Sequence, residues 1–282
     1  MKQEVKPWFF FKRNAEKSEI RLRLFLFPPA GGDVSTFLHW EEQMPRDVET
    51  CLVRLPGRGA RITEPAIDNV DILTDLLLQE MKEYTDVPYV LFGHSMGGLV
   101  SYELTQKIYK QGLNLPEYVI ISSMKAPNYM NKFTESLTED GNDKLYLKSN
   151  TEFMDTIIGL GGIPDAFSEN REFLELILPT FRKDMKMCET YNPENAQAIP
   201  VSFDIYGGNR DSIATKKELE GWKKYTTQKY ALTLFQGNHF YFMDNPNMLL
   251  FHLRNKLMDI GNKLTDQTHR EWRMKDECDS NR

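Results

Sequence analysis

Short apolar runs recur along the chain, and segments with helical spacing separate them. Six runs are rich in β-branched and aromatic residues and have the length of buried strands. Apolar residues recur every three or four positions in segments 70–84 and 99–110, which predicts helices there. This alternation predicts a mostly parallel central sheet flanked by helices, with ligands at the carboxyl ends of its strands. The predicted strands are Arg21–Phe27, Thr50–Leu55, Tyr89–Phe92, Tyr118–Ser122, Val201–Tyr206 and Lys229–Phe235.

The stretch from about 126 to 191 breaks this alternation. It contains no convincing strand, and its apolar residues fall at helical intervals. Pro179 lies inside one such pattern and predicts either a kink or two abutting helices. We interpret the stretch as a helical lid inserted over the strand ends; a helical layer packed permanently on the sheet is the alternative. The polar tail, about 262–282, predicts a frayed helix or a disordered segment. We expect one α/β domain over residues 1–282.

Composition and charge exclude several classes of function. Hydrophobic residues make up 40% of the chain and charged residues 27%, and no apolar stretch approaches the length of a membrane span. The net charge of −6 offers no electrostatic basis for general nucleic-acid binding. The run Trp8–Phe11 is too short for a signal-peptide core, and three scattered cysteines lack metal-ligand spacing. We therefore expect a cytoplasmic protein with reduced thiols and no nucleic-acid, membrane or metal partner.

Residues 92–98 read Phe-Gly-His-Ser-Met-Gly-Gly and directly follow the apolar run Pro88–Leu91. They contain the G-x-S-x-G pattern of a nucleophile elbow, a sharp strand-to-helix turn that presents a serine hydroxyl. The bare pattern is weak, because an incidental serine in a glycine-rich turn produces it too. The strand before it and the helix after it favour the functional interpretation, in which Ser95 is a covalent nucleophile.

Such a serine needs a base and an acid, which in hydrolases of the elbow type follow it in the order acid, then histidine. Of the five histidines, His239 is placed best, since it lies in a turn directly after the last predicted strand. His252 falls within a helical pattern. Asp211 follows the preceding strand at its carboxyl end and is the favoured acid, whereas its rival Asp204 lies within that strand. A turn aspartate bonded to its own backbone is the structural alternative for Asp211.

An oxyanion hole is the third requirement, and it needs two backbone N–H groups. Met96, the residue after the nucleophile, is expected to supply one. The loop Phe27–Gly32 reads Phe-Pro-Pro-Ala-Gly-Gly and follows an early predicted strand. Because Pro28 and Pro29 have no N–H, Ala30 is the first donor that this loop offers.

Together these motifs resemble the type II thioesterases that accompany nonribosomal peptide and polyketide synthases, over roughly residues 20–260. The most discriminating marker is Pro-Gly-Arg-Gly-Ala-Arg at residues 56–61. Position 29, often His or Tyr in the family, is Pro here, and the charged tail runs beyond the usual family end. The other markers are Leu26–Gly32 with Phe37 and Trp40, Glu64–Pro65, Phe92–Gly98, Leu178–Asp184 with Tyr191, Tyr206–Gly208 and Gly237–Phe240.

The resemblance implies an α/β-hydrolase fold with a helical lid. It implies an enzyme that removes short or aberrant acyl and aminoacyl groups from the phosphopantetheine thiol of acyl- or peptidyl-carrier proteins. Ser95 is then the nucleophile, Asp211 the acid and His239 the base, with Ala30 and Met96 as oxyanion donors. The substrate carries phosphopantetheine, so the family implies no metal and no free cofactor. We expect a monomer.

Three alternatives stay open. A medium-chain acyl-carrier thioesterase, or a product-releasing thioesterase or acyltransferase, fits the same motifs; the lack of an attached carrier domain argues against the integrated release type. A non-catalytic binding protein of this fold would normally show a broken triad, whereas all three candidates stand in order here.

Two sets of residues near the predicted site have two interpretations each. Arg58 and Arg61 either shape the pantetheine entrance or form internal ion pairs that hold their loop near the site, and we favour the ion pairs. Aromatic residues of the inserted stretch either line an acyl pocket or pack in the core. These are Phe133, Phe153, Phe167 and Phe173.

Overall fold

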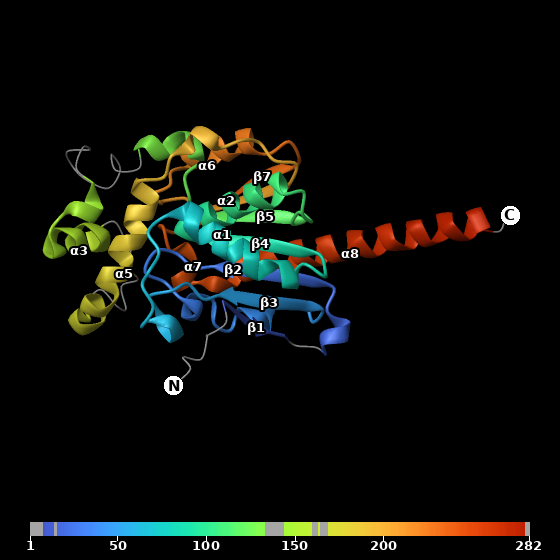
Figure 1. Cartoon of the computed structure of the whole chain (residues 1–282), viewed down its shortest axis with the longest axis horizontal. Helices are drawn as coiled ribbons and strands as arrows, with labels where there is room; N and C mark the ends of the chain where they lie inside the picture. Colours follow the sequence, from blue (N-terminus) through green and yellow to red (C-terminus); the bar gives the residue numbers. More distant parts are fainter. Residues whose placement is uncertain (1–7, 14–15, 133–143, 160–162, 164–168, 280–282) are drawn as a thin grey trace.

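The computed structural model describes residues 8–13, 16–132, 144–159, 163 and 169–279. A seven-stranded sheet in the order β1-β3-β2-β4-β5-β6-β7 forms its centre (Figure 1). The β1–β3 pairing is antiparallel and the other five pairings are parallel, so the predicted mostly parallel sheet is confirmed. The strands are β1 (Phe9–Lys12), β2 (Leu22–Phe27), β3 (Val48–Val53), β4 (Tyr89–His94), β5 (Tyr118–Ser122), β6 (Ser202–Gly208) and β7 (Tyr230–Phe235).

The apolar pattern of the sequence does not predict strand β1. It is four residues long and pairs with β3 in the register Phe9 to Val53. Phe9 is buried and contacts the rings of Phe25 and Tyr84 edge-on. The run Trp8–Phe11 is therefore an edge strand whose aromatic side chain completes the core.

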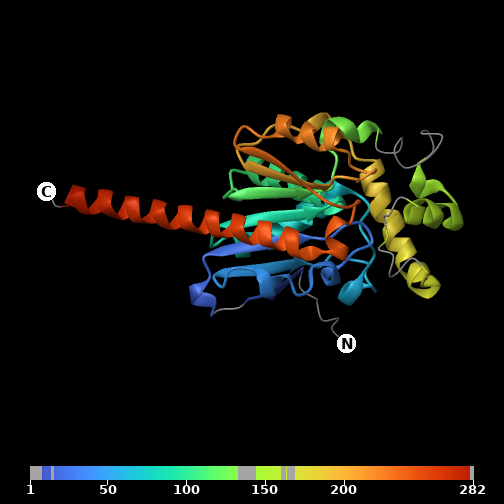
Figure 2. The same cartoon turned by 180° about the vertical axis from the view of Figure 1, so that it is seen from behind.

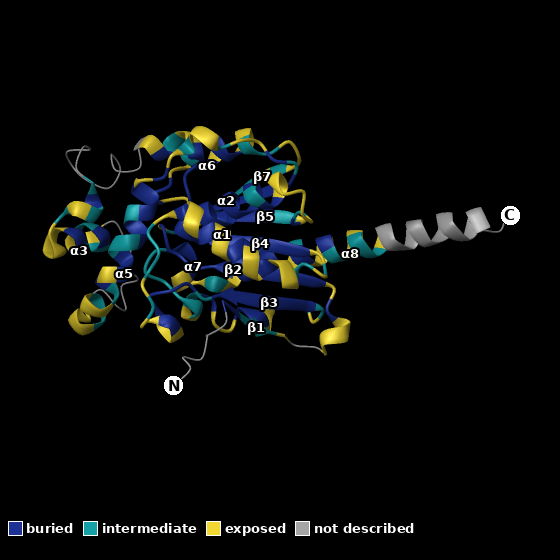
Figure 3. Ribbon diagram, viewed as in Figure 1, coloured by how far each residue is buried: buried dark blue, intermediate teal, exposed yellow. Residues whose placement is uncertain are grey.

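Helices cover both faces of the sheet, as the alternating pattern predicts (Figures 1 and 2). Every residue of β2 is buried because alternate side chains enter different cores: Phe25 and Phe27 pack with α1 and α2, whereas Leu24 and Leu26 pack with α8. Figure 3 shows the central strands as buried, whereas the edge strands β1 and β7 are mostly half-buried. The helices are α1 (Val70–Met81), α2 (Met96–Lys110), α3 (Asn150–Gly159), α5 (Arg171–Glu189), α6 (Lys216–Glu220), α7 (Tyr241–Asp244) and α8 (Pro246–Asp279).

The chain between β5 and β6 contains α3 and α5, and its described residues form no strand of the sheet. Both helices lie at the end of the sheet where the parallel strands terminate (Figure 1). Asn170 caps the N-terminus of α5, since its side chain accepts a hydrogen bond from the Phe173 amide, and the helix continues through Pro179. The alternative of two abutting helices at Pro179 is therefore wrong.

Helix α8 continues beyond Gly261 to Asp279, so the polar tail is helical rather than disordered over this range. Its final turns extend away from the body of the molecule (Figures 1 and 2). Arg21 donates to the Thr265 hydroxyl at 3.4 Å, near the point where α8 leaves the sheet. Among the described residues, no helix is both long and apolar enough to cross a membrane.

Candidate active site

Ser95 occupies the sharp turn between β4 and α2, as the nucleophile-elbow pattern predicts. Its φ of +52° and ψ of −122° are strained for a residue with a side chain. Neighbouring glycines permit the turn, because a Cβ at Gly93 would lie 2.0 Å from the Gly97 carbonyl oxygen, and one at Gly97 would lie 2.1 Å from that of Phe27. The Ser95 amide donates to the Ser122 carbonyl at 2.7 Å, which fixes the turn on β5.

The structure brings the predicted base and acid to this serine. His239 Nε2 lies 3.0 Å from Ser95 Oγ, and His239 Nδ1 lies 3.0 Å from Asp211 Oδ2. His239 and Asp211 are buried, whereas Ser95 is half-buried. Asp204 instead pairs with Lys256 at 2.7 Å, so the rival acid is engaged elsewhere. This is the geometry that a serine nucleophile, its base and an orienting carboxylate require.

The environment of Asp211 keeps its carboxyl ionised. Burial by itself raises the pKa, but the charge and hydrogen bond of His239 and the Ala214 amide act in the opposite direction and prevail. The net effect lowers the pKa of Asp211 below its ordinary value. Its second oxygen accepts from the Ile213 and Ala214 amides at 2.9 and 3.0 Å. The carboxylate is therefore fixed in position to orient His239.

The two predicted oxyanion donors lie on facing segments. Gly97, one residue after Met96, packs against the backbone of Phe27 and Pro28, so the loop after β2 and the start of α2 are in contact. Met96 begins α2, where the first N–H groups have no partner within the helix. Within the described part of the chain, neither the Met96 nor the Ala30 amide has a hydrogen-bond acceptor. Both are free to stabilise a negative charge.

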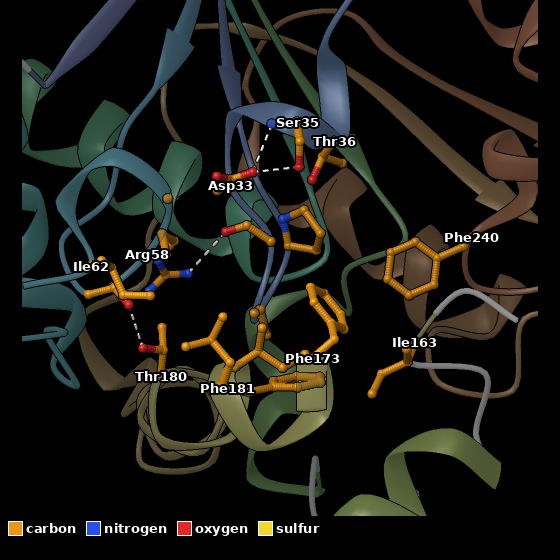
Figure 4. A pocket seen from close by; sticks show the side chains of 18 of the residues that line it. Asp33, Ser35, Thr36, Arg58, Ile62, Ile163, Phe173, Thr180, Phe181 and Phe240 are labelled. Carbon is orange, nitrogen blue, oxygen red and sulfur yellow. Dashed lines mark hydrogen bonds between the residues drawn. The ribbon is translucent and has the colours of Figure 1, made fainter. Parts of the chain in front are cut away.

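A cavity of about 570 Å³ has Ala30 in its wall. Figure 4 shows other lining residues, among them Arg58, Phe181 and Phe240. The loops after β2 and β3 form one side of it, and α5 forms the other. Ser95 and His239 are not part of its wall, but Ala30 and Phe240, the neighbour of His239, are. The cavity therefore borders the candidate site and suits an apolar group. Its apolar side chains are Pro29, Ala30, Ile62, Ile163, Phe173, Leu176, Ile177, Phe181, Phe240 and Met243.

The aromatic residues proposed for a pocket have different surroundings. Phe173 lines the cavity. Phe153 is fully buried and packs edge-on against Phe181 at 5.7 Å, so core packing is the correct interpretation for it. Phe133 and Phe167 lie outside the described residues.

Arg58 and Arg61 form internal ion pairs, as the favoured interpretation predicts. Arg58 binds Asp184 of α5 through two hydrogen bonds of 2.6 and 2.7 Å. Arg61 binds Glu64 at 2.6 and 2.9 Å, donates to the Arg54 carbonyl and lies over the Trp8 ring. The loop after β3 is thereby tied to α5. The helical pattern around Asp184 does not predict this contact.

His94, which precedes the nucleophile, is a further buried group at this site. Its Nδ1 lies 2.9 Å from the Ser122 hydroxyl, which in turn lies 2.8 Å from the Tyr241 hydroxyl. Its ring centre is 5.2 Å from that of His239, and its Nε2 has no hydrogen-bond partner among the described residues. Burial, and secondarily the charge of His239, lowers the pKa of His94 well below its ordinary value. His94 is therefore neutral beside the candidate base.

One group among the described residues brings potential metal ligands together: His39, Glu41 and Glu42, before β3. Lys12 forms an ion pair with Glu41, and His39 Nδ1 lies 2.8 Å from Glu42. These contacts engage Oε1 of Glu41, Oε1 of Glu42 and Nδ1 of His39. The group includes none of Ser95, His239 and Asp211.

Comparison with known proteins adds an independent line of evidence. A sequence model of the thioesterase domain family matches residues 22–257. The chain is 28% identical over 243 residues to the gramicidin S biosynthesis protein GrsT of Aneurinibacillus migulanus. This match covers 86% of the chain and 90% of GrsT. It is 28% identical over 235 residues to the probable anguibactin biosynthesis thioesterase AngT of Vibrio anguillarum, with coverage of 81% and 89%.

A solved structure matches the fold as a whole. RedJ, a thioesterase from the prodiginine biosynthetic pathway of Streptomyces coelicolor, superposes with a TM-score of 0.77 and 30% identity. The match covers 90% of this chain and 96% of RedJ. It confirms the predicted α/β-hydrolase fold.

Proposed function

The chain belongs to the thioesterase domain family, and from this premise we propose that it is a type II thioesterase. Its proposed substrates are short or aberrant acyl and aminoacyl thioesters on the phosphopantetheine arm of carrier proteins. The observation that carries the proposal is the hydrogen-bonded series from Asp211 through His239 to Ser95, beside an apolar cavity. The names of GrsT, AngT and RedJ, each tied to a biosynthetic pathway, support this class of substrate.

The first half of the proposed reaction forms an acyl-enzyme. His239 Nε2 takes the Ser95 proton as Oγ attacks the thioester carbonyl carbon, and Asp211 stabilises the resulting imidazolium. The Ala30 and Met96 amides donate to the oxygen that becomes negative. The carbon–sulfur bond then breaks, and the imidazolium proton passes to the departing sulfur, which leaves His239 neutral for the second half. A thiol with a pKa of about 8.5 leaves readily, so proton donation by His239 matters less than for an amide.

The second half releases the acid. His239 takes a proton from a water molecule, whose oxygen attacks the acyl carbon of the Ser95 ester, and the same two amides stabilise the second oxyanion. Collapse of this intermediate returns the proton to Ser95 Oγ. Every proton transfer is assigned to His239, and no step uses a metal or a free cofactor.

The cavity and the inserted helices complete the proposal. The acyl group occupies the cavity between Ala30 and α5, where the mostly apolar wall excludes water from the intermediate. Helices α3 and α5 act as the lid, and the carrier protein delivers the thioester on its flexible arm. We propose that the enzyme acts as a monomer in the cytoplasm, where the buried free thiols of Cys51 and Cys188 stay reduced.

The proposal is tested by the hydrolysis of acetyl, hexanoyl and aminoacyl thioesters, each offered on a phosphopantetheinylated carrier protein and on free pantetheine. We expect faster release from the carrier and tolerance of several short groups. Ser95→Ala should reduce turnover at least about 10³-fold. Ser18→Ala, which removes an exposed hydroxyl outside the cavity lining, is the control and should behave like the wild type.

Other results identify the competing functions. Strong preference for one longer chain would indicate a medium-chain acyl-carrier thioesterase, and product that forms only with an added alcohol or amine would indicate a transferase. Binding of acyl-carrier protein without turnover would indicate a non-catalytic protein. Turnover that persists in Ser95→Ala would contradict the assignment of the nucleophile.

A further inference from the structure

A hydrogen bond to α5 holds the loop that contains Ala30, although the two bonded residues are more than 150 positions apart in the sequence. Gly32 N–H donates to the Pro29 carbonyl at 3.0 Å, which closes a β-turn around Ala30 and Gly31. Gly31 has φ +71° whereas Ala30 has no positive φ, so the turn is type II. In a type II turn the central peptide has one defined orientation, and here it directs the Gly31 N–H toward α5.

Asp184 of α5 receives that N–H. Its Oδ2 accepts from Gly31 at 2.8 Å, and the same carboxylate holds Arg58 through both of its oxygens. The Asp184 side chain is 0% exposed and that of Arg58 is 6% exposed. Arg58 also donates to the Gly32 carbonyl at 3.3 Å (Figure 4). A buried carboxylate requires such a partner, because an unpaired charge in the interior is strongly unfavourable.

These contacts leave one free donor in the loop. Pro28 and Pro29 have no N–H, Gly31 donates to Asp184, and Gly32 donates within the turn. Rotation of the central peptide would turn the Ala30 carbonyl oxygen toward the Asp184 carboxylate. The negative charge on the carboxylate would repel the partial negative charge of this carbonyl oxygen and oppose the rotation. Asp184 therefore selects the turn conformation in which Ala30 alone offers a donor.

We propose that Asp184 is a positioning residue for the oxyanion hole, with Arg58 as its fixed counter-charge. The inference rests on the proposed thioester hydrolysis. Because Asp184 belongs to α5, the second oxyanion donor is held in place only while this helix is docked on the loop after β2. The proposed lid thus takes part in catalysis as well as in enclosing the acyl group.

A simpler role for Asp184 would be to anchor α5. The chain offers a matched control for that role, since Lys186 of the same helix pairs with Asp68 at 2.8 Å without contacting the loop. Asp184→Asn removes the charge and cannot serve both Arg58 and Gly31 as the carboxylate does. Asp68→Asn weakens only the anchor.

The test compares wild type, Asp184→Asn, Arg58→Lys and Asp68→Asn on a hexanoyl thioester. Inhibition by a trifluoromethyl ketone with a six-carbon chain is measured in parallel, since Ser95 converts this ketone into an oxyanion adduct. Active sites are counted by a covalent serine reagent, so that misfolded protein is excluded from every rate. For Asp184→Asn we expect kcat to fall about 10- to 100-fold, with KM within about twofold of wild type. The inhibition constant should rise by the same factor as kcat/KM falls.

Arg58→Lys should show a smaller effect of the same kind, and Asp68→Asn should match wild type. If Asp184→Asn lowers only the number of active sites, or if Asp68→Asn reproduces its loss of kcat, the positioning role is wrong. Failure of the proposed function is separate, because it would be seen as wild-type protein without turnover or as turnover retained in Ser95→Ala.

Discussion

Single residues at the site are placed by different kinds of constraint. Ser95 is held in a strained conformation, at a cost of about 1–3 kcal/mol, by glycines that leave no room for a Cβ. His239 and Asp211 follow strands β7 and β6, so the sheet itself brings them together. His94 is placed by aromatic packing, with Phe240 and Phe242 ring centres at 5.1 and 4.8 Å. This packing keeps His94 neutral next to His239.

The neutrality of His94 predicts a specific pH dependence of stability. Its pKa is lowered in the folded state, so below about pH 6.5, the ordinary value, the unfolded chain binds a proton that the folded protein does not. Acidification therefore favours unfolding, by up to about 1.4 kcal/mol per pH unit. Urea denaturation at pH 7.5 and 5.5 measures this loss. We expect His94→Phe to lose less stability between these values than wild type, and an equal loss in both would contradict the assignment.

The sequence predicts the position of a residue at the site correctly where the neighbouring residues determine that position. Ser95, Asp211 and His239 were recognised because each directly follows an apolar strand pattern, and the structure places the three within hydrogen-bond distance. Asp184 was missed because its partners Gly31 and Arg58 lie 153 and 126 positions away. Nothing in the helical pattern around Asp184 indicates that its carboxylate is buried.

At the scale of elements, apolar periodicity predicted the six longer strands but not β1. Four residues that end in Lys12 are too few to distinguish an edge strand from an isolated aromatic run. In helix α5, by contrast, the sequence pattern predicts an interruption that the structure does not have. Pro179 indicated an interruption, yet the packing of Leu178, Phe181 and Met185 against the core keeps one helix through it. Tertiary contacts outweighed the local penalty of the proline.

The position of α5 in the cavity wall leads to a prediction about selection for acyl length. Ile177 lines the cavity, so Ile177→Trp should fill part of it and exclude longer chains. We expect kcat/KM for hexanoyl relative to acetyl thioesters to fall about tenfold, equal to roughly two methylene groups of apolar contact. Glu175→Trp adds the same bulk at an exposed position of α5 and serves as the control. An unchanged ratio in Ile177→Trp would mean that the acyl group binds elsewhere.

The whole molecule divides into a body and a projecting helix end. Contacts of α8 with the sheet extend to Leu264 and Thr265, and the following turns leave the body in both views (Figures 1 and 2). Removal of residues 267–282 should therefore leave the melting temperature within about 2 °C of wild type, which corresponds to less than 1 kcal/mol. Calorimetry and thioester turnover test this. A large drop in either would show that the helix end supports the body.

In the proposed reaction a carrier-bound thioester acylates Ser95, with His239 as the base. Intact-protein mass spectrometry after rapid mixing with hexanoyl-carrier protein detects this acyl-enzyme. We expect a transient mass increase of one hexanoyl group, located by proteolysis to the peptide that contains Ser95, and no such increase in Ser95→Ala. His239→Ala should form the acyl-enzyme far more slowly. Acylation at another residue, or hydrolysis by Ser95→Ala at the wild-type rate, would show that Ser95 is not the nucleophile.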